Sequence, residues 1–226
     1  GAWRAFRLAQ SYGAPQAALE ARALQKGLSG EEAGELWRGH LEDLHGGVRR
    51  FSAVCDVSGR IGERSLSEQA MLTFRAPKDL TLEILGPLFA PVARARVDET
   101  GFAMDPFPVE GAKDGQVRES VDAVLSSVAG VLAGEPFLPG PAKLDSGWGR
   151  RDLDRPAWRV AIGDDGLARS ATPAGGAPMR LDAFFKAGPR RIPDVFSGKG
   201  RFWEFKISCP DPKVETDPFP APAEAR

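Results

Sequence analysis

The chain has 226 residues, enough for one large β domain or two small ones. Its 30 basic and 31 acidic residues give a net charge of −1, so charge offers no reason to expect nucleic acid or an anionic membrane surface as the main partner. No window approaches the roughly 18 to 20 apolar residues that span a bilayer, and no leader peptide is visible.

Helices are predicted for residues 1–46. Residues 1–28 are rich in Ala, Leu, Gln and Arg and form a helical extension. A second helix opens at Ser29, which has the spacing of a capping box with Glu32. Gly46 and Gly47 end this helix.

Alternating apolar residues then predict consecutive antiparallel strands up to residue 104. FSAVCDVSG places Phe51, Cys55 and Val57 on one face, and RIGERSLSE is taken as a turn region. AMLTFRAP, DLTLEIL, PVARARVD and GFAM follow with short links. This order indicates an antiparallel meander.

The link GPLFAP, residues 86–91, departs from the rule that turns are polar. It carries Leu88 and Phe89 between Pro87 and Pro91. Two interpretations remain: an exposed probe for a membrane or a partner protein, or a loop folded back onto the end of the sheet.

The next predicted helix has apolar residues from Val121 to Leu132 on one face and ends at Gly134, after a polar loop at 105–119. It either closes the core or forms a lid over a cavity. An irregular connection precedes further strands at AWRVAIG, LARSAT, APMRLDAFFK, IPDVFSG and RFWEFKISC, with a DDG hairpin turn at 164–166. So many strands in one sheet curl toward a barrel or half-barrel.

Catalytic and metal-binding signatures are absent from the sequence. His40 and His45, five residues apart, do not share a helix face and are read as surface histidines. No phosphate-binding loop, GxSxG or HExxH motif occurs. We therefore expect neither an enzyme nor a cofactor.

Cys55 and Cys209 both fall on apolar strand faces. They are either two buried free thiols or a disulfide that ties the first strand to the last, which requires an oxidising compartment.

Several of these segments resemble one known family. GVRRFSAVCDVSG, FRAPKDLTLEILGPL, the helix ending at Gly134 with EPFLP, and RFWEFKISCPDPKVETDPFPAP resemble the LolA/LolB-like periplasmic fold of lipoprotein carriers and receptors. The pattern covers about residues 33–221 and consists of apolar alternation with Pro and Gly steps. Phe89 replaces the family's usual glycine, and a lipid-modified cysteine is absent from the start of the chain.

The resemblance implies a mainly β (α+β) fold, a curled antiparallel sheet that forms an incomplete barrel of about eleven strands, with helices covering the concave face. It implies one domain at 29–212, followed by a Pro-rich tail at 213–226. It also implies a periplasmic, outer-membrane-associated protein that binds lipid or lipoprotein acyl chains. Its partners would be the inner leaflet of the outer membrane and a periplasmic carrier protein.

In that interpretation Leu88 and Phe89 form the membrane or partner loop, and inward-facing apolar residues line a lipid cavity. The expected lining consists of Leu72, Phe74, Leu80, Leu82, Ile84, Val124, Val128, Trp158, Val160, Trp203 and Phe205. The alternative is a structural or scaffolding subunit of an envelope complex that has the same fold with a filled core.

Overall fold

The computed structural model describes residues 28–105, 114–145 and 151–218. The predicted extension at 1–28 therefore lies almost wholly outside the described residues. The helical elements are α3 (Gly30–His45), η1 (Pro87–Phe89), α4 (Asp114–Leu132) and η2 (Glu135–Phe137). The strands are β1 (Val48–Ile61), β2 (Arg64–Arg75), β3 (Asp79–Leu85), β4 (Pro91–Asp98), β5 (Gly101–Met104), β6 (Lys143–Asp145), β7 (Asp152–Asp154), β8 (Trp158–Ile162), β9 (Ala168–Pro173), β10 (Met179–Ala187), β11 (Arg190–Lys199), β12 (Trp203–Ser208) and β13 (Lys213–Thr216).

The strands form one antiparallel sheet of thirteen strands, counted over the described residues. The order is β5-β4-β3-β2-β1-β12-β11-β10-β9-β8-β7-β6, with β13 pairing β1 beside this path. The two ends of the sheet, β5 and β6, do not pair with each other, so the sheet stays open. The predicted mainly β fold with a curled, incomplete barrel is confirmed, and so is the meander from β1 to β5.

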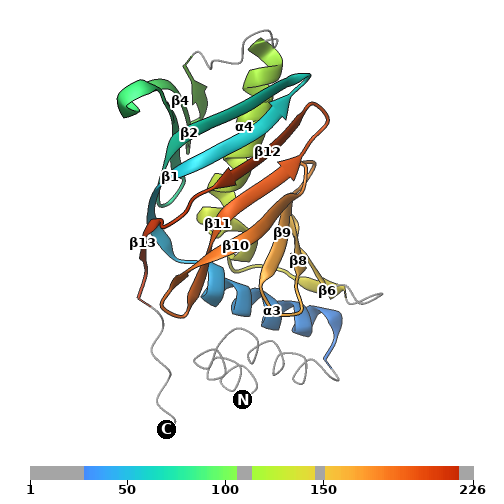
Figure 1. The fold of residues 1–226 in the computed structure, drawn as a ribbon. Coiled ribbons are helices and arrows are strands. Elements are labelled where there is room, and N and C mark those ends of the chain that lie inside the picture. The colour runs from blue at the N-terminus through green and yellow to red at the C-terminus, as the bar shows by residue number, and fades with distance from the viewer. Residues whose placement is uncertain (1–27, 106–113, 146–150, 219–226) are drawn as a thin grey trace.

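The inner face of the sheet curls around α4, and α3 lies across one end of it (Figure 1). Side chains that alternate along β1, such as Phe51, Ala53 and Cys55, are buried, as the period-two pattern predicts. They join α3 and α4 in one continuous apolar core. No helix in the described part of the chain is long and apolar enough to cross a membrane.

Several predicted boundaries were wrong. The predicted turn region RIGERSLSE is mostly strand, because β1 extends to Ile61, β2 begins at Arg64, and only two residues separate them. The polar loop expected at 105–119 ends early, since α4 begins at Asp114. The irregular connection after α4 holds the short strands β6 and β7, and the predicted tail begins with β13.

The pairing along one edge of β1 is interrupted in the middle. Ser52 pairs with Lys213 of β13, and Asp56 pairs with Ser208 of β12, so three residues of β1 between them have no partner strand on that side. The chain kinks there because it reads Pro210-Asp211-Pro212, and proline has no N–H to give to a ladder.

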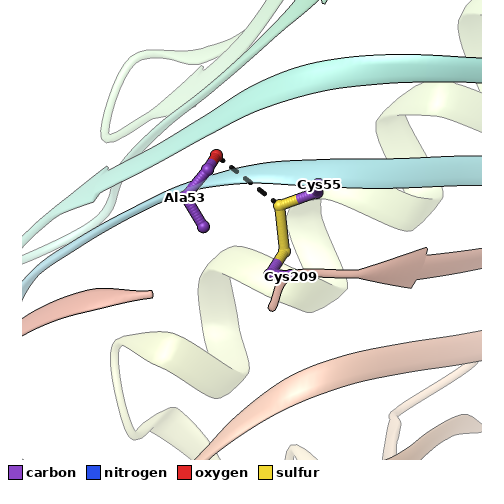
Figure 2. The surroundings of a disulfide bond; sticks show 3 residues. All are labelled: Ala53, Cys55 and Cys209. Carbon is purple, nitrogen blue, oxygen red and sulfur yellow. Dashed lines mark hydrogen bonds between the residues drawn. A yellow bond between two sulfur atoms is a disulfide. The ribbon is translucent and has the colours of Figure 1, made fainter. Parts of the chain in front are cut away.

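A disulfide between Cys55 and Cys209 lies at this interruption (Figure 2). Both cysteines are fully buried. Cys55 Sγ also lies 3.7 Å from the Ala53 carbonyl oxygen, a van der Waals contact because a disulfide sulfur carries no hydrogen. The bond closes a loop of 154 residues, which stabilises the fold by roughly 5 kcal/mol in the chain-entropy description.

Helix α3 begins as predicted. Ser29 caps it, with the Ser29 hydroxyl accepting from the Glu32 N–H at 3.2 Å and the Glu32 carboxylate accepting from the Ser29 N–H at 2.9 Å. This reciprocal pair is a capping box. It satisfies two backbone donors that would otherwise lack partners at the start of the helix.

The prediction that His40 and His45 are surface residues was wrong, because α3 is covered on more than one side. His40 is fully buried, and its Nε2 donates to the Gly166 carbonyl at 3.1 Å. His45 Nδ1 donates to the Arg191 carbonyl at 2.5 Å, while its Nε2 accepts from the Ala168 N–H at 3.1 Å. The two rings therefore fasten α3 to the sheet in their neutral forms.

Burial, the largest cause in each case, lowers the pKa of His40 to about 3 and that of His45 to about 4. The unfolded chain binds both protons near pH 6.5, whereas the folded chain does not, so stability is complete above pH 6.5 and falls below it. We expect the free energy of unfolding to drop by about 1.4 kcal/mol per pH unit for each histidine between pH 6 and pH 4.5.

Urea unfolding at a series of pH values measures this slope. The variant His40→Gln keeps an N–H donor for Gly166 but cannot protonate, so it should lose about half of the slope. An unchanged slope in His40→Gln would show that the buried histidines do not control acid stability.

Candidate functional site

The link between β3 and β4 is the most exposed apolar feature among the described residues. Leu88 is 97% exposed and Phe89 is 69% exposed, and Val92 beside them is 55% exposed. The loop extends from the edge of the sheet next to β4 (Figure 1). Of the two interpretations of GPLFAP, the loop folded back onto the sheet is wrong, because Leu88 is almost fully exposed to solvent.

The backbone holds these side chains outward in an unfavourable conformation. Leu88 has φ 61° and Phe89 has φ 59°, both in the left-handed region that costs a residue with a Cβ roughly 1–2 kcal/mol. The loop is closed by its own backbone, with the Gly86 N–H donating to the Ala90 carbonyl at 2.8 Å. Strain of this kind persists where the surrounding structure determines it, and it is common at binding sites.

A second feature is an apolar cavity between the middle of α4 and the sheet. Helix α4 contributes Val121, Val124 and Leu125, and the inner face of the sheet contributes Leu82 and Phe205. The remaining lining comes from Val57, Ser58, Gly59, Arg60, Ile61, Leu66, Ser120, Trp203, Glu204 and Ile207. The lining residues Leu66, Val124 and Trp203 are only half-buried, so they mark the side on which the cavity opens.

The packing of β12 explains why space remains there. Phe205 pairs with Gly59 of β1 on one side and with Gly198 of β11 on the other. A Cβ built on Gly198 would lie 2.9 Å from the Phe205 ring, so the ring leans over β11. Trp203 crowds Gly200 in the same way, with 2.4 Å between its ring and a Cβ built there. The inner surface over Gly59 is left without a side chain.

The cavity has a volume of about 50 Å³ in this structure. A dry cavity of about 150 Å³ holds one benzene molecule, so the present space accommodates only a few methylene groups. A whole acyl chain fits only if α4 moves away from the sheet.

Side-chain contacts fasten α4 near both of its ends. Just beyond its C-terminal end, Glu135 forms an ion pair with Lys78 at 2.8 Å, and Arg155 donates to the Pro136 carbonyl at 2.7 Å. These contacts fasten the end of the helix near η2, whereas the cavity lies under the middle of the helix, from Ser120 to Leu125. Near the start of the helix, Arg118 lies over the Phe102 ring of β5.

The predicted lining residues are divided between the cavity and the filled core. Leu82, Val124, Trp203 and Phe205 line the cavity. The others pack in the continuous core away from it, and they are Leu72, Phe74, Leu80, Ile84, Val128, Trp158 and Val160. Sequence reasoning missed Leu66 and Gly59, since Leu66 was assigned to a turn and a glycine carries no apolar signal.

Among the described residues, no group of three or more His, Cys, Asp or Glu side chains could hold a metal ion.

Comparisons with solved structures give similarities at low identity. The chain resembles a LolA superfamily protein from Nitrosomonas europaea, with 10% identity, a TM-score of 0.47 and coverage of 83% of this chain and 95% of the other. It also resembles a DUF1329 family protein from Desulfovibrio piger, with 7% identity, a TM-score of 0.43 and coverage of 83% and 94%. A third structure, named as an outer membrane lipoprotein-sorting protein domain from Vibrio parahaemolyticus, has 6% identity, a TM-score of 0.40 and coverage of 74% and 86%.

No family model matches this chain, and no curated protein matches it. At these identities the similarity concerns the fold alone.

The strain in the loop predicts an unusual response to glycine. Leu88→Gly relieves the left-handed penalty of roughly 1–2 kcal/mol and adds roughly 0.5–1 kcal/mol of chain entropy loss, so it should leave stability unchanged or raise it by up to about 1.5 kcal/mol. Val92→Gly, at an exposed strand position with ordinary φ, should lower stability. Urea unfolding of both variants measures the contrast, and a loss of about 2 kcal/mol or more in Leu88→Gly would mean that Leu88 is packed.

Proposed function

We propose that this chain is a non-enzymatic cell-envelope protein that binds the acyl chains of lipids or lipoproteins and touches a membrane with Leu88 and Phe89. The observation that carries this proposal is the loop, in which two large apolar side chains are held in water by a strained backbone. Burial of that apolar area in a lipid bilayer would repay the strain, at about 25 cal/mol per Å².

The cavity supplies the second part of the proposal. Its lining is almost entirely apolar, and methylene groups buried there would each contribute about 0.8 kcal/mol. In the proposed cycle the present structure is the closed form. The part of α4 up to Leu125 lifts, an acyl chain enters between α4 and β12, and no covalent bond changes.

The proposed location is the periplasm, at the inner leaflet of the outer membrane, with a periplasmic carrier protein as the donor of cargo. The sequence resemblance suggests this location. The buried disulfide agrees with it, because such bonds form in oxidising compartments such as the periplasm.

The alternative function, a structural or scaffolding subunit, has its own supporting observation. The cavity is small, and most residues expected to line it are packed in the core. In that case α4 simply completes the core, and the loop docks on a protein rather than a membrane.

Blocking the cavity separates the two functions. Val124→Trp places a large ring in the cavity, and Ala123→Trp places the same ring on the exposed side of α4 as a matched control. We expect lipid extraction and mass spectrometry to find acyl chains with the wild-type protein and Ala123→Trp, and about tenfold less with Val124→Trp. If the wild-type protein carries no acyl chain and takes up none from mixed micelles, the scaffolding function is favoured.

Membrane contact is tested separately with the loop. The double variant Leu88→Glu and Phe89→Glu should abolish flotation with phosphatidylethanolamine and phosphatidylglycerol liposomes, because two carboxylates would have to leave water. Its stability should stay within about 0.5 kcal/mol of the wild type, as is usual for surface changes. Undiminished flotation of the double variant would exclude the loop as the membrane anchor.

A further inference from the structure

Half of strand β2 lacks a neighbour on one side in the described structure. Over its whole length β2 pairs with β1, from Arg64 to Arg75. On its other side, β3 pairs only with Ala70 to Arg75. At the point where β3 leaves, a register irregularity between Ile84 and Leu85 turns the chain into the exposed loop 86–91. Residues 64–69 of β2 are therefore a sheet edge.

The hairpin at the start of β2 determines which backbone groups face this edge. A two-residue connection joins Ile61 to Arg64, and Gly62 has the positive φ, 61°, of the first position of a type II′ turn. Such a turn makes Ile61 and Arg64 a hydrogen-bonded pair, and the pattern then alternates along β2. The N–H and C=O groups of Ser65, Ser67 and Gln69 point away from β1. Those of Ser65 and Ser67 lie on the open side, whereas Gln69 faces Leu85 at the end of β3, next to the pair Ala70–Ile84.

The side chains along this edge leave it accessible. Ser65, Ser67, Glu68 and Gln69 are exposed, and no proline occurs between 64 and 69. Exposed strand edges in natural proteins are usually blocked by proline, bulges or a covering segment, because they pair readily with another chain. The edge carries the charged side chains of Arg64 and Glu68, which give it partial protection, and the outward-facing backbone groups of Ser65 and Ser67 lie open beyond the end of β3.

The position of the edge connects it with both parts of the candidate site. Leu66, in the middle of the edge, lines the cavity on its open side. The far end of the edge meets the loop that carries Leu88 and Phe89. A strand added along β2 would turn every second side chain toward the inner face, level with Leu66. A group attached at such a position would lie at the cavity opening.

We propose that residues 65–69 of β2 bind the backbone of an extended polypeptide whose acylated end occupies the apolar cavity. This inference rests on the proposed function and specifies its cargo as a lipidated polypeptide rather than a free lipid. A free lipid has no backbone amides to pair with Ser65 and Ser67, whereas an extended segment of about six residues, roughly 20 Å long, runs the length of the edge and matches them. The edge thus recognises main chain, and the cavity recognises methylene groups.

Three probes test the proposal by equilibrium binding. The first is a ten-residue Ser/Asn/Ala/Thr peptide with two palmitoyl chains on its N-terminal cysteine, the second is the doubly palmitoylated cysteine alone, and the third is the peptide without acyl chains. For the wild-type protein we expect the acylated peptide to bind about tenfold more tightly than the acylated cysteine, as a few added hydrogen bonds would give. The acylated peptide should also protect the amides of 65–69 from hydrogen exchange.

Ser67→Pro removes one outward N–H without touching the pairs with β1, and proline is tolerated at such edge positions. The Ser67→Pro variant should bind the acylated peptide no more tightly than the acylated cysteine. Its affinity for the acylated cysteine should equal that of the wild-type protein. Ser67→Ala keeps the N–H and is the matched control. It should still bind the acylated peptide about tenfold more tightly than the acylated cysteine. If Ser67→Pro does not fold, amide protection in the wild-type protein carries the test.

The outcomes separate the two proposals. If the acylated cysteine binds but the peptide adds nothing and protects no amide at 65–69, the edge inference is wrong and the proposed function stands. If neither acylated probe binds, the proposed function fails and the inference fails with it. If amide protection at 65–69 increases with protein concentration when no probe is present, a second copy of this chain occupies the edge. That result would overturn the proposal.

Discussion

The pairing of β1 is the constraint on which the rest of the structure depends. This fourteen-residue strand pairs with β2 along most of its length and with β12 and β13 on its other side, so it joins the two halves of the sheet. Where that second ladder breaks, the Cys55–Cys209 bond holds the halves together. Strands β2 and β12, which both contribute to the lining of the cavity, pair with β1 on its two sides. The free edge of β2 and the apolar loop lie in the half of the sheet formed by β1 to β5, and the cavity borders the same half.

Glycine placement decides whether the enclosed space is filled. Phe205 lies between two glycines in register, and its ring leans toward Gly198 rather than over Gly59. A larger residue on β11 would push the ring back over β1 and close the cavity. The cavity is small, and the end of α4 beside η2 is fastened by the contacts of Glu135 and Pro136. Under the proposed function, the binding energy of an acyl chain would have to exceed the cost of separating α4 from the sheet.

Prediction from sequence succeeded where the signal is local and periodic. The alternation in β1, β3 and β12, the capping box at Ser29 and the turn around Gly166 each need only a few neighbouring residues to be recognised. It failed where the environment comes from distant segments. His40 and His45 looked like surface residues because they lie on different faces of α3, but β6, β11 and the β8–β9 hairpin cover both faces. Leu66 was assigned to a turn because Gly62 and the polar residues around it resemble a longer loop.

The sequence by itself determined an antiparallel sheet with two apolar helices and an apolar link between its third and fourth strands, since alternation and punctuation specify these features residue by residue. That the sheet stays open was implied by the resemblance. It also limited Cys55 and Cys209 to two states. Only the tertiary structure decided that the cysteines meet where a ladder breaks, that Leu88 and Phe89 extend into solvent, and that β3 covers only half of β2. These outcomes depend on strand register and sheet curvature. The cysteine pairing joins segments 154 residues apart, which no local pattern encodes, and the β2–β3 pairing ends beside the register irregularity between Ile84 and Leu85.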